Sequence, residues 1–385
     1  MFKGVVILNK LPKICGFLAA LFIALHAFSV SAEIAPVYIH EETSGNLTFS
    51  ANVFLPEKQL YEVFKVEKQI WNGDEILALL RPRDYGSWTK EERKLATPDT
   101  FYSNSSDDWL RVQDGDVSYS TKIMRSYIEV LGHALPYFSI PNVGPVENSC
   151  WDTTHAPSED VMFEASLDFI SPKDAVQQCR AFIQEMGIEQ QVALVRFDAI
   201  TYQDLISWSE QMAREDEMYA LFLENGKATD IGNFDEKLDL YCLTFGIVEN
   251  ELWVYGPLEQ ALPLTMENEI AFPQTIQIIY TKEGISSINA QNIVRRASHG
   301  KQEEILTFEQ AKEKVSSFLS NDLENKYTCL QVYVSYIPIG DYYEDDMEYR
   351  PFWNFYMVFD VTYESFPERY YKILRMDAVT GEILW

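Results

Sequence analysis

The sequence predicts an α+β protein in which helices pack on antiparallel sheets, with two similar units after an N-terminal α+β domain. Three observations lead to this fold class. Residues 45–56 alternate apolar and polar side chains, which is typical of a half-buried strand. Two amphipathic helices with capping residues are expected after Ser171 and Thr307. Several strand-like segments follow each helix, which indicates one helix layered on one sheet in each unit.

The first 32 residues have the three parts of a secretory signal peptide. Lysines supply positive charge, residues 14–28 form an apolar run, and Val30-Ser31-Ala32 offers small residues at a cleavage site. The run is shorter than the roughly 20 residues that span a bilayer. We therefore expect cleavage before Glu33 and a secreted or extracytoplasmic protein without a stable membrane span. An uncleaved anchor is the alternative.

Residues 33–145 are predicted to form the N-terminal domain. After the first strand we expect a strand at 61–66, a short helix at 74–80 and a strand at 117–121. The stretch from Arg81 to Asp116 is rich in charged residues, Gly, Ser and Asn, and is predicted to be mostly loop. Pro141, Pro145 and Pro157 then interrupt the pattern and mark a domain boundary.

The first repeated unit is predicted at 160–300. Ser171 can cap its helix, Pro172 suits the first helical position, and Gly187 ends the helix. The strands expected after it lie at 192–197, 238–247, 251–255, 276–280 and 285–288. Helical spacing of apolar residues at 202–223 indicates an insert between the first two strands.

The second unit is predicted at 301–385. Thr307 and Gln310 match a capping box, and strands are expected at 329–336, 352–363, 370–376 and 382–385. Aligning Ser171 with Thr307 also aligns these pairs: Ala175 with Ala311, Cys179 with Val315, Phe182 with Phe318, and Ile183 with Leu319. We interpret the two units as an ancient duplication.

The charge of the chain excludes one class of partner, and its cysteines raise the question of disulfide bonds. The chain has 31 basic and 59 acidic residues and a formal net charge of −28, which repels phosphate backbones, so we expect no nucleic-acid partner. Cys150, Cys179, Cys242 and Cys329 remain after signal cleavage. They could form two disulfides, but buried free thiols are the expectation that we prefer, and Cys179 lies on the apolar face of its helix.

Residues 376–384 read Met-Asp-Ala-Val-Thr-Gly-Glu-Ile-Leu and resemble the end of a PepSY-type unit. The tandem arrangement also resembles the extracytoplasmic YycI/YycH regulatory proteins and a family of uncharacterised exported proteins of Gram-positive bacteria. The shared features of that family are carried here by Ala311, Gly284, Pro351 to Phe355 and Asp377 to Gly381. The resemblance covers residues 165–385 and implies binding of a protein or cell-envelope ligand. A cleavable signal replaces the anchor helix of YycI/YycH.

Sequence motifs for catalysis are absent. His40, His133, His155 and His299 form no HExxH pair, and the chain has no Gly-x-Ser-x-Gly, Walker or Gly-x-Gly-x-x-Gly motif. Cys150 and His155 are near in sequence, which alone does not predict a nucleophile. Acidic loops at 340–346 and 230–239 could offer oxygen ligands to Ca²⁺, but a solvated loop is the simpler interpretation. We expect no cofactor, no bound metal and no enzymatic activity.

Trp88 and Trp109 are the candidate ligand contacts, because both fall in polar, loop-like sequence where exposed rings can stack on sugars or peptides. Their alternative role is to anchor a loop to the core. Trp353 is expected in the core. The leading hypothesis is an extracytoplasmic non-enzymatic binding or regulatory protein of unknown ligand. The alternative is a carboxylate-based hydrolase of cell-wall or dietary glycans, which needs two acids roughly 5 to 10 Å apart.

Overall fold

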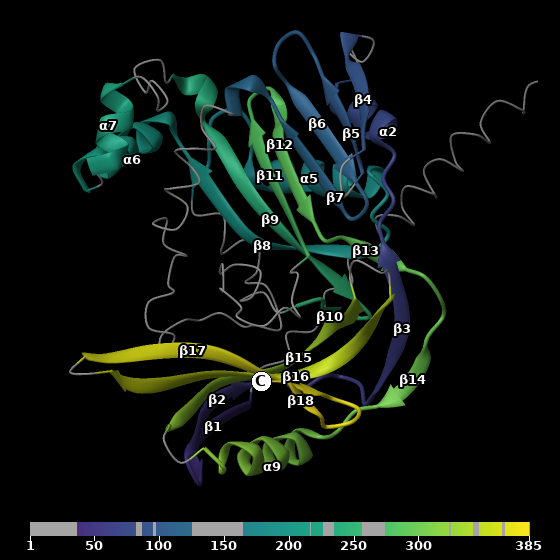
Figure 1. Ribbon diagram of the computed structural model, residues 1–385, viewed down its shortest axis with the longest axis vertical. Coiled ribbons are helices and arrows are strands. Elements are labelled where there is room, and N and C mark those ends of the chain that lie inside the picture. The colour runs from purple at the N-terminus through teal and green to yellow at the C-terminus, as the bar shows by residue number, and fades with distance from the viewer. Residues whose placement is uncertain are drawn as a thin grey trace, which may run out of the picture. The chain divides into compact units, whose positions relative to one another are not determined.

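Two sheets carry the fold in the computed structural model (Figure 1). The structure describes residues 37–81, 87–94, 98–124, 165–215, 217–225, 235–255, 274–322, 325–341, 346–363 and 366–384. The described chain is a mixed α+β protein with more strand than helix, which agrees with the predicted class. The predicted signal peptide and the proline-rich boundary near residue 145 lie outside these residues.

One sheet, called here the C-terminal sheet, is built mainly from the end of the chain. Its order is β1-β2-β15-β16-β17-β18, and β3 joins it through β16 while pairing also with β13 and β14. The pairing of β2 with β15 is parallel, and the others are antiparallel. Its strands are Val37–Ser44 (β1), Leu47–Val53 (β2), Leu60–Lys68 (β3), Val294–Arg296 (β13), Lys301–Glu304 (β14), Tyr327–Asp341 (β15), Asp346–Tyr363 (β16), Phe366–Asp377 (β17) and Ile383–Leu384 (β18).

The other sheet, called here the central sheet, is antiparallel throughout. Its order is β10-β9-β11-β12-β7-β6-β5-β4, with β8 paired to β9. Its strands are Thr89–Arg93 (β4), Asp99–Ser103 (β5), Trp109–Gln113 (β6), Asp116–Ser120 (β7), Gln191–Ile200 (β8), Leu240–Glu249 (β9), Leu252–Trp253 (β10), Thr275–Thr281 (β11) and Gly284–Gln291 (β12).

The described strands of residues 33–145 do not form a sheet of their own. β1, β2 and β3 join the C-terminal sheet, whereas β4 to β7 extend the central sheet by the pairing of β7 with β12. This differs from the expected N-terminal domain, because these strands belong to two sheets that also contain later parts of the chain. The predicted loop from Arg81 to Asp116 is also wrong, since β4, β5 and β6 lie within it.

The helix α5 (Pro172–Glu185) begins and ends as its sequence predicts. The Ser171 hydroxyl accepts a hydrogen bond from the Asp174 amide at 3.2 Å, and Gly187 follows the helix with a φ of +101°. Two contacts place α5 against the central sheet. The Arg180 guanidinium lies 6.0 Å from the Phe245 ring centre, and the Tyr280 hydroxyl donates to the Gln178 side chain at 2.5 Å.

The helix α9 (Phe308–Leu319) has the complete capping box expected from Thr307 and Gln310. Its first residue, Phe308, contacts the C-terminal sheet, with ring-centre distances of 6.5 Å to Phe49 and 6.0 Å to Trp353. Trp353 is buried, as expected, and its indole N–H donates to the Leu306 carbonyl at 3.0 Å. The short helix α2 (Gly73–Leu80) also forms where the sequence predicts it.

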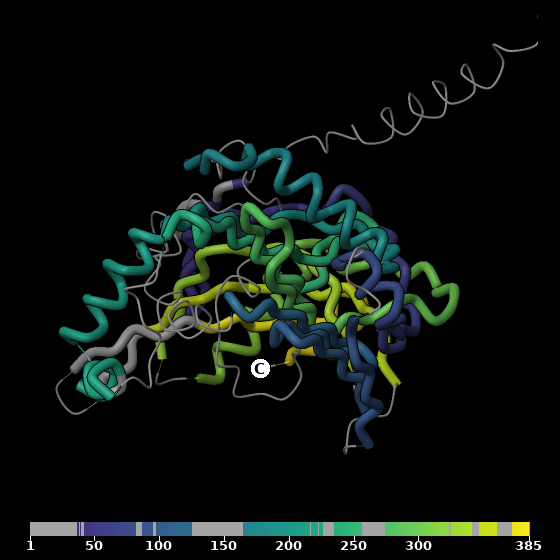
Figure 2. Tube along the Cα trace, turned by 90° about the horizontal axis from the view of Figure 1, so that it is seen from above, coloured from purple at the N-terminus to yellow at the C-terminus, as the bar shows by residue number. Residues whose placement is uncertain are grey.

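The insert between β8 and β9 consists of the helices α6 (Tyr202–Glu215) and α7 (Glu217–Glu224) and the turn η4 (Glu236–Leu238). The insert is attached through a small apolar cluster, in which Leu205 packs with Cys242 and Ile279 of the central sheet. Figures 1 and 2 both show α6 and α7 projecting away from the strands.

A continuous buried cluster includes apolar side chains from both sheets. The sheets are linked where Val254 forms a parallel bridge with Tyr336 and the Tyr255 amide donates to the Tyr336 carbonyl at 2.9 Å. The described residues from Val37 onward accordingly belong to one compact unit. Among the described helices, none has the length and apolar character needed to cross a membrane.

Candidate functional site

A row of mostly polar side chains crosses the central sheet on one face. Each member is the direct register partner of the next, from β4 to β8: Glu91, Phe101, Arg111, Ser118, Asn289, Gln277, Thr244 and Arg196. Alternate residues of the same strands, such as Leu110, Ile278 and Leu243, are buried in the core. Because neighbouring strands are about 4.8 Å apart, the row extends for roughly 34 Å. The sheet therefore has one apolar face and one polar face.

A cavity of about 270 Å³ lies on this polar face. It is lined by Arg111, Gln113, Asp116, Ser118, Gln291 and Asn292, which come from β6, β7, the end of β12 and the residue after it. Pockets that enclose a whole small molecule are commonly about 300 to 1,000 Å³. This cavity therefore suits one chemical group of a larger ligand.

Asp99 holds two arginines beside the cavity. Its carboxylate has no exposed side-chain surface and accepts from Arg93 at 2.7 and 2.6 Å, and from Nε of Arg111 at 2.5 Å. The hydrogen bond from Arg93 lowers the pKa of Asp99, and the bond from Arg111 lowers it further against the opposing effect of burial. Two guanidinium groups thus share one carboxylate, and the carboxylates of Asp116 and Glu91 lie nearby.

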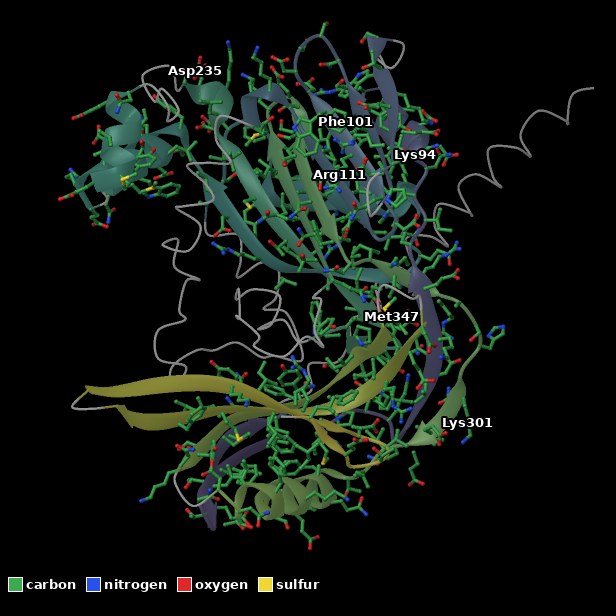
Figure 3. All side chains as sticks on the ribbon, in the orientation of Figure 1. Lys94, Phe101, Arg111, Asp235, Lys301 and Met347 are labelled. Carbon is green, nitrogen blue, oxygen red and sulfur yellow. The ribbon has the colours of Figure 1, made fainter. Side chains whose placement is uncertain are left out.

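Two aromatic rings lie next to the arginines. The Arg93 guanidinium is 4.6 Å from the ring centre of Phe101, and Phe101 stacks with Trp109 at a centroid distance of 6.2 Å and an interplanar angle of 18°. Figure 3 labels Phe101 and Arg111, which are direct partners on β5 and β6. Trp109 and Arg111 are two residues apart on one strand, so their side chains leave the same face about 7 Å apart.

Internal hydrogen bonds fix the cavity wall. The Asp116 carboxylate accepts from the Asn292 amide at 2.7 Å and from the Gln113 side chain. The Gln113 side-chain oxygen accepts from Nη2 of Arg111 at 2.7 Å. Asn292 has a φ of +55°, a left-handed conformation that asparagine tolerates. The polar groups of the wall are therefore positioned before a ligand arrives.

The other end of the polar row, at β8 and β9, is more buried. Arg196 and Asp198 form an ion pair at 2.7 Å, with 14% of each side chain exposed. Burial raises the pKa of Asp198, although Arg196 opposes the shift. The neighbouring Cys242 thiol has its pKa raised to about 12 by burial, so it is protonated near neutral pH. This end offers no reactive thiolate and is packed against the α6 insert.

The two tryptophans that the sequence predicts as ligand contacts lie in different environments. Trp109 lies at the start of β6 beside Phe101 on the polar face. Trp88 instead packs against the main core, in the anchoring role that was its alternative. No motif in the sequence marks Arg93, Asp99, Phe101 and Arg111 as site residues. The sequence signal for the last three of these residues is their alternation along β5 and β6 with Tyr102, Leu110 and Val112, which are buried on the opposite face of the sheet.

Other predicted sites are only partly described. Residues 342–345 and 230–234 of the acidic loops, and both Cys150 and His155, lie outside the described residues. At the remaining ends of those loops, Asp346 pairs with Lys65 and Asp239 accepts from the Tyr202 amide. His299 is exposed. Within the described part of the chain, no three His, Cys, Asp or Glu residues are grouped closely enough to hold a metal ion.

Comparison with known proteins provides a structural relative. The chain matches no protein-family model and no curated protein. Its structure is similar to the 1.45 Å crystal structure of an uncharacterised protein from Eubacterium rectale ATCC 33656, with a TM-score of 0.56 and 14% sequence identity. The similarity covers 88% of this chain and 91% of the other. At this identity the relative supports the fold.

Proposed function

We propose that this chain is an extracytoplasmic, non-enzymatic binding or regulatory protein, and that it binds its ligand on the polar face of the central sheet. The observation that carries this proposal is the cavity lined by Arg111, with the Phe101–Trp109 pair next to Arg111 on the same face of the sheet. Aromatic rings contribute contact area, and fixed polar groups orient a ligand. Secretion, in the manner of Gram-positive exported proteins, follows in this proposal from the signal-like residues 1–32.

We also propose that α5 and α9 each begin one of two duplicated, PepSY-like helix-over-sheet units. Support comes from their equivalent caps at Ser171 and Thr307 and from the antiparallel strands that follow each helix. The terminal Asp377 turn also fits this interpretation. Asp377 accepts from the amides of Val379 and Thr380, both at 2.8 Å. These are packing features, which agree with a scaffold for contact.

The hydrolase alternative needs a different arrangement. It requires two nearby acids in one pocket, one of them with a raised pKa. The cavity described above is lined by one carboxyl group, Asp116, and both of its oxygens accept internal hydrogen bonds. Asp198 has a raised pKa but lies on β8, outside the cavity lining. These observations favour binding as the leading proposal.

Capture of cell-envelope fragments tests this function. The protein beginning at Glu33 would be immobilised and exposed to sonicated Gram-positive wall fragments. We expect retention that falls at least about tenfold in Trp109→Ala, a loss comparable to that of one good contact. The control is Phe318→Ala, which removes an aromatic side chain that is 38% exposed on α9. Equal retention by both variants, or turnover of the wall fragments, would contradict the proposal.

A further inference from the structure

We infer that the ligand is an anionic saccharide, whose oxyanion is bound by Arg111 and whose sugar ring lies against Trp109. This inference rests on the proposed binding function of the same face. The inference follows from which hydrogen-bond donors and acceptors of the site are still available to a ligand. Both carboxylates near the cavity already accept hydrogen bonds, Asp99 from two arginines and Asp116 from Gln113 and Asn292.

The donors of Arg111 are in surplus. A guanidinium has five N–H donors, and Arg111 uses one toward Asp99 and one toward Gln113. Its side chain is 41% exposed and lines the cavity. The cavity thus offers available charged donors on Arg111, beside a carboxylate whose two oxygens each already accept a hydrogen bond. This inventory matches a ligand group that is rich in acceptors, such as a carboxylate or a phosphate ester.

The position of the site favours a saccharide over a peptide. Peptides that add to a sheet bind at a free strand edge through backbone hydrogen bonds. Here the cavity lies on the face of interior strands β6 and β7, whose backbones already pair on both sides. A ligand must use side chains, and the rim offers the Ser118 hydroxyl and the Gln291 amide. Such groups suit sugar hydroxyls, and the partly exposed Trp109 suits the apolar face of a sugar ring.

The charge of the whole protein limits the charge of the ligand. A formal net charge of −28 repels long polyanions, so the ligand of this proposal carries one or a few charges within reach of Arg111. The attraction is partly exposed to solvent, and it should therefore weaken as salt increases.

Titration calorimetry with three probes tests the inference. The probes are a digalacturonate, its neutral methyl ester and a sugar phosphate. We expect the uronate to bind about tenfold more tightly than the ester, since a charged hydrogen bond commonly contributes that factor. The sugar phosphate distinguishes a preference for phosphate from a preference for carboxylate. In Arg111→Gln the advantage of the charged probes should disappear. Arg295→Gln is the control, because Arg295 is 42% exposed and ion-paired with Glu67.

A second variant separates ligand binding from folding. Gln291→Glu places a negative charge at the cavity without altering the Asp99 network, and it should weaken only the charged probes. Equal binding of charged and neutral probes, unchanged by either variant, would overturn the anionic preference while leaving the binding function intact. If no probe binds although wall fragments are still retained through Trp109, the saccharide class is wrong. If Trp109→Ala does not reduce wall retention, the proposed function itself fails.

Discussion

Nε of Arg111 lies 2.5 Å from a carboxylate oxygen of Asp99, although the two residues are not register partners. Arg111 is opposite Phe101, so its side chain passes diagonally across β5 to reach Asp99. The same carboxylate also binds Arg93 on β4. One acidic side chain therefore joins three adjacent strands at the edge of the central sheet, and it fixes the arginine that lines the cavity.

Replacing Asp99 should weaken the fold at neutral pH. Asp99→Asn should lower the free energy of unfolding by about 1.5 kcal/mol, the low end for hydrogen bonds to charged groups, because both arginines are partly exposed. Urea unfolding at pH 7 measures the difference. Asp107→Asn is the control, since Asp107 pairs with Lys122 at the surface and both side chains are at least 60% exposed.

The same contact gives a pH dependence with a definite sign. The pKa of Asp99 is lowered in the folded protein, so its contribution is present above the ordinary Asp pKa of about 3.9 and is lost as the pH falls through the lower folded value. Unfolding curves from pH 7 to pH 2 should show the wild-type and Asp99→Asn stabilities converging at acid pH. A constant difference over this range would contradict the assignment.

The buried cysteines should be unreactive in the native protein. Burial raises the pKa of Cys179 and Cys242 to about 12, and it raises that of Cys329 further. A protein that begins at Glu33 and carries Cys150→Ser should show almost no reaction with Ellman's reagent at pH 8. The same sample in denaturant without reductant should show three thiols. Fewer than three would indicate a disulfide among them.

Two glycines should respond differently to substitution by alanine. A Cβ at Gly300 would lie 2.3 Å from the Val63 carbonyl oxygen and 2.6 Å from the Phe64 Cβ, so Gly300→Ala should cost about 2 kcal/mol or more. Gly284 has a φ of +98°, but a Cβ there would meet no atom within 4 Å, so Gly284→Ala should cost about 1 kcal/mol from backbone strain. Thermal unfolding of both variants compares these effects, and equal shifts would contradict the steric explanation.

The helix cap at Thr307 offers a further test. Thr307→Ala removes the side-chain acceptor of the Gln310 amide and should cost about 1 kcal/mol. Thr307→Ser keeps the hydroxyl and should retain most of the stability. Denaturant unfolding distinguishes the two, and equal losses would assign the effect to the methyl group of threonine.

Features determined by nearby residues could be predicted from the sequence. The start of α5 at Ser171 and of α9 at Thr307 follows from capping residues within one helical turn. The alternation in β2 likewise predicts which of its side chains are buried. The pairing of β2 with β15 could not be predicted, because it depends on the packing of segments far apart in the chain.

Most of the candidate site could not be predicted for a related reason. Strands β4, β5 and β6 are each five residues long, and their polar side chains make the stretch resemble a loop. Those outward side chains are the ones that line or flank the cavity. Trp109 is singled out by its polar surroundings, but its neighbours Phe101 and Arg111 become apparent only when β5 and β6 are placed in register.

The pairing of β2 with β15 also determines when the protein can finish folding. Because ribosomes make the amino-terminal residues first, β2 is synthesised long before β15, its partner in the C-terminal sheet. β2 can pair with β1 on one side, but its other edge lacks its partner until Tyr327 and the residues after it have been made. Completion of this sheet is necessarily a late event, and a chain that stops before β15 leaves β2 without that neighbour.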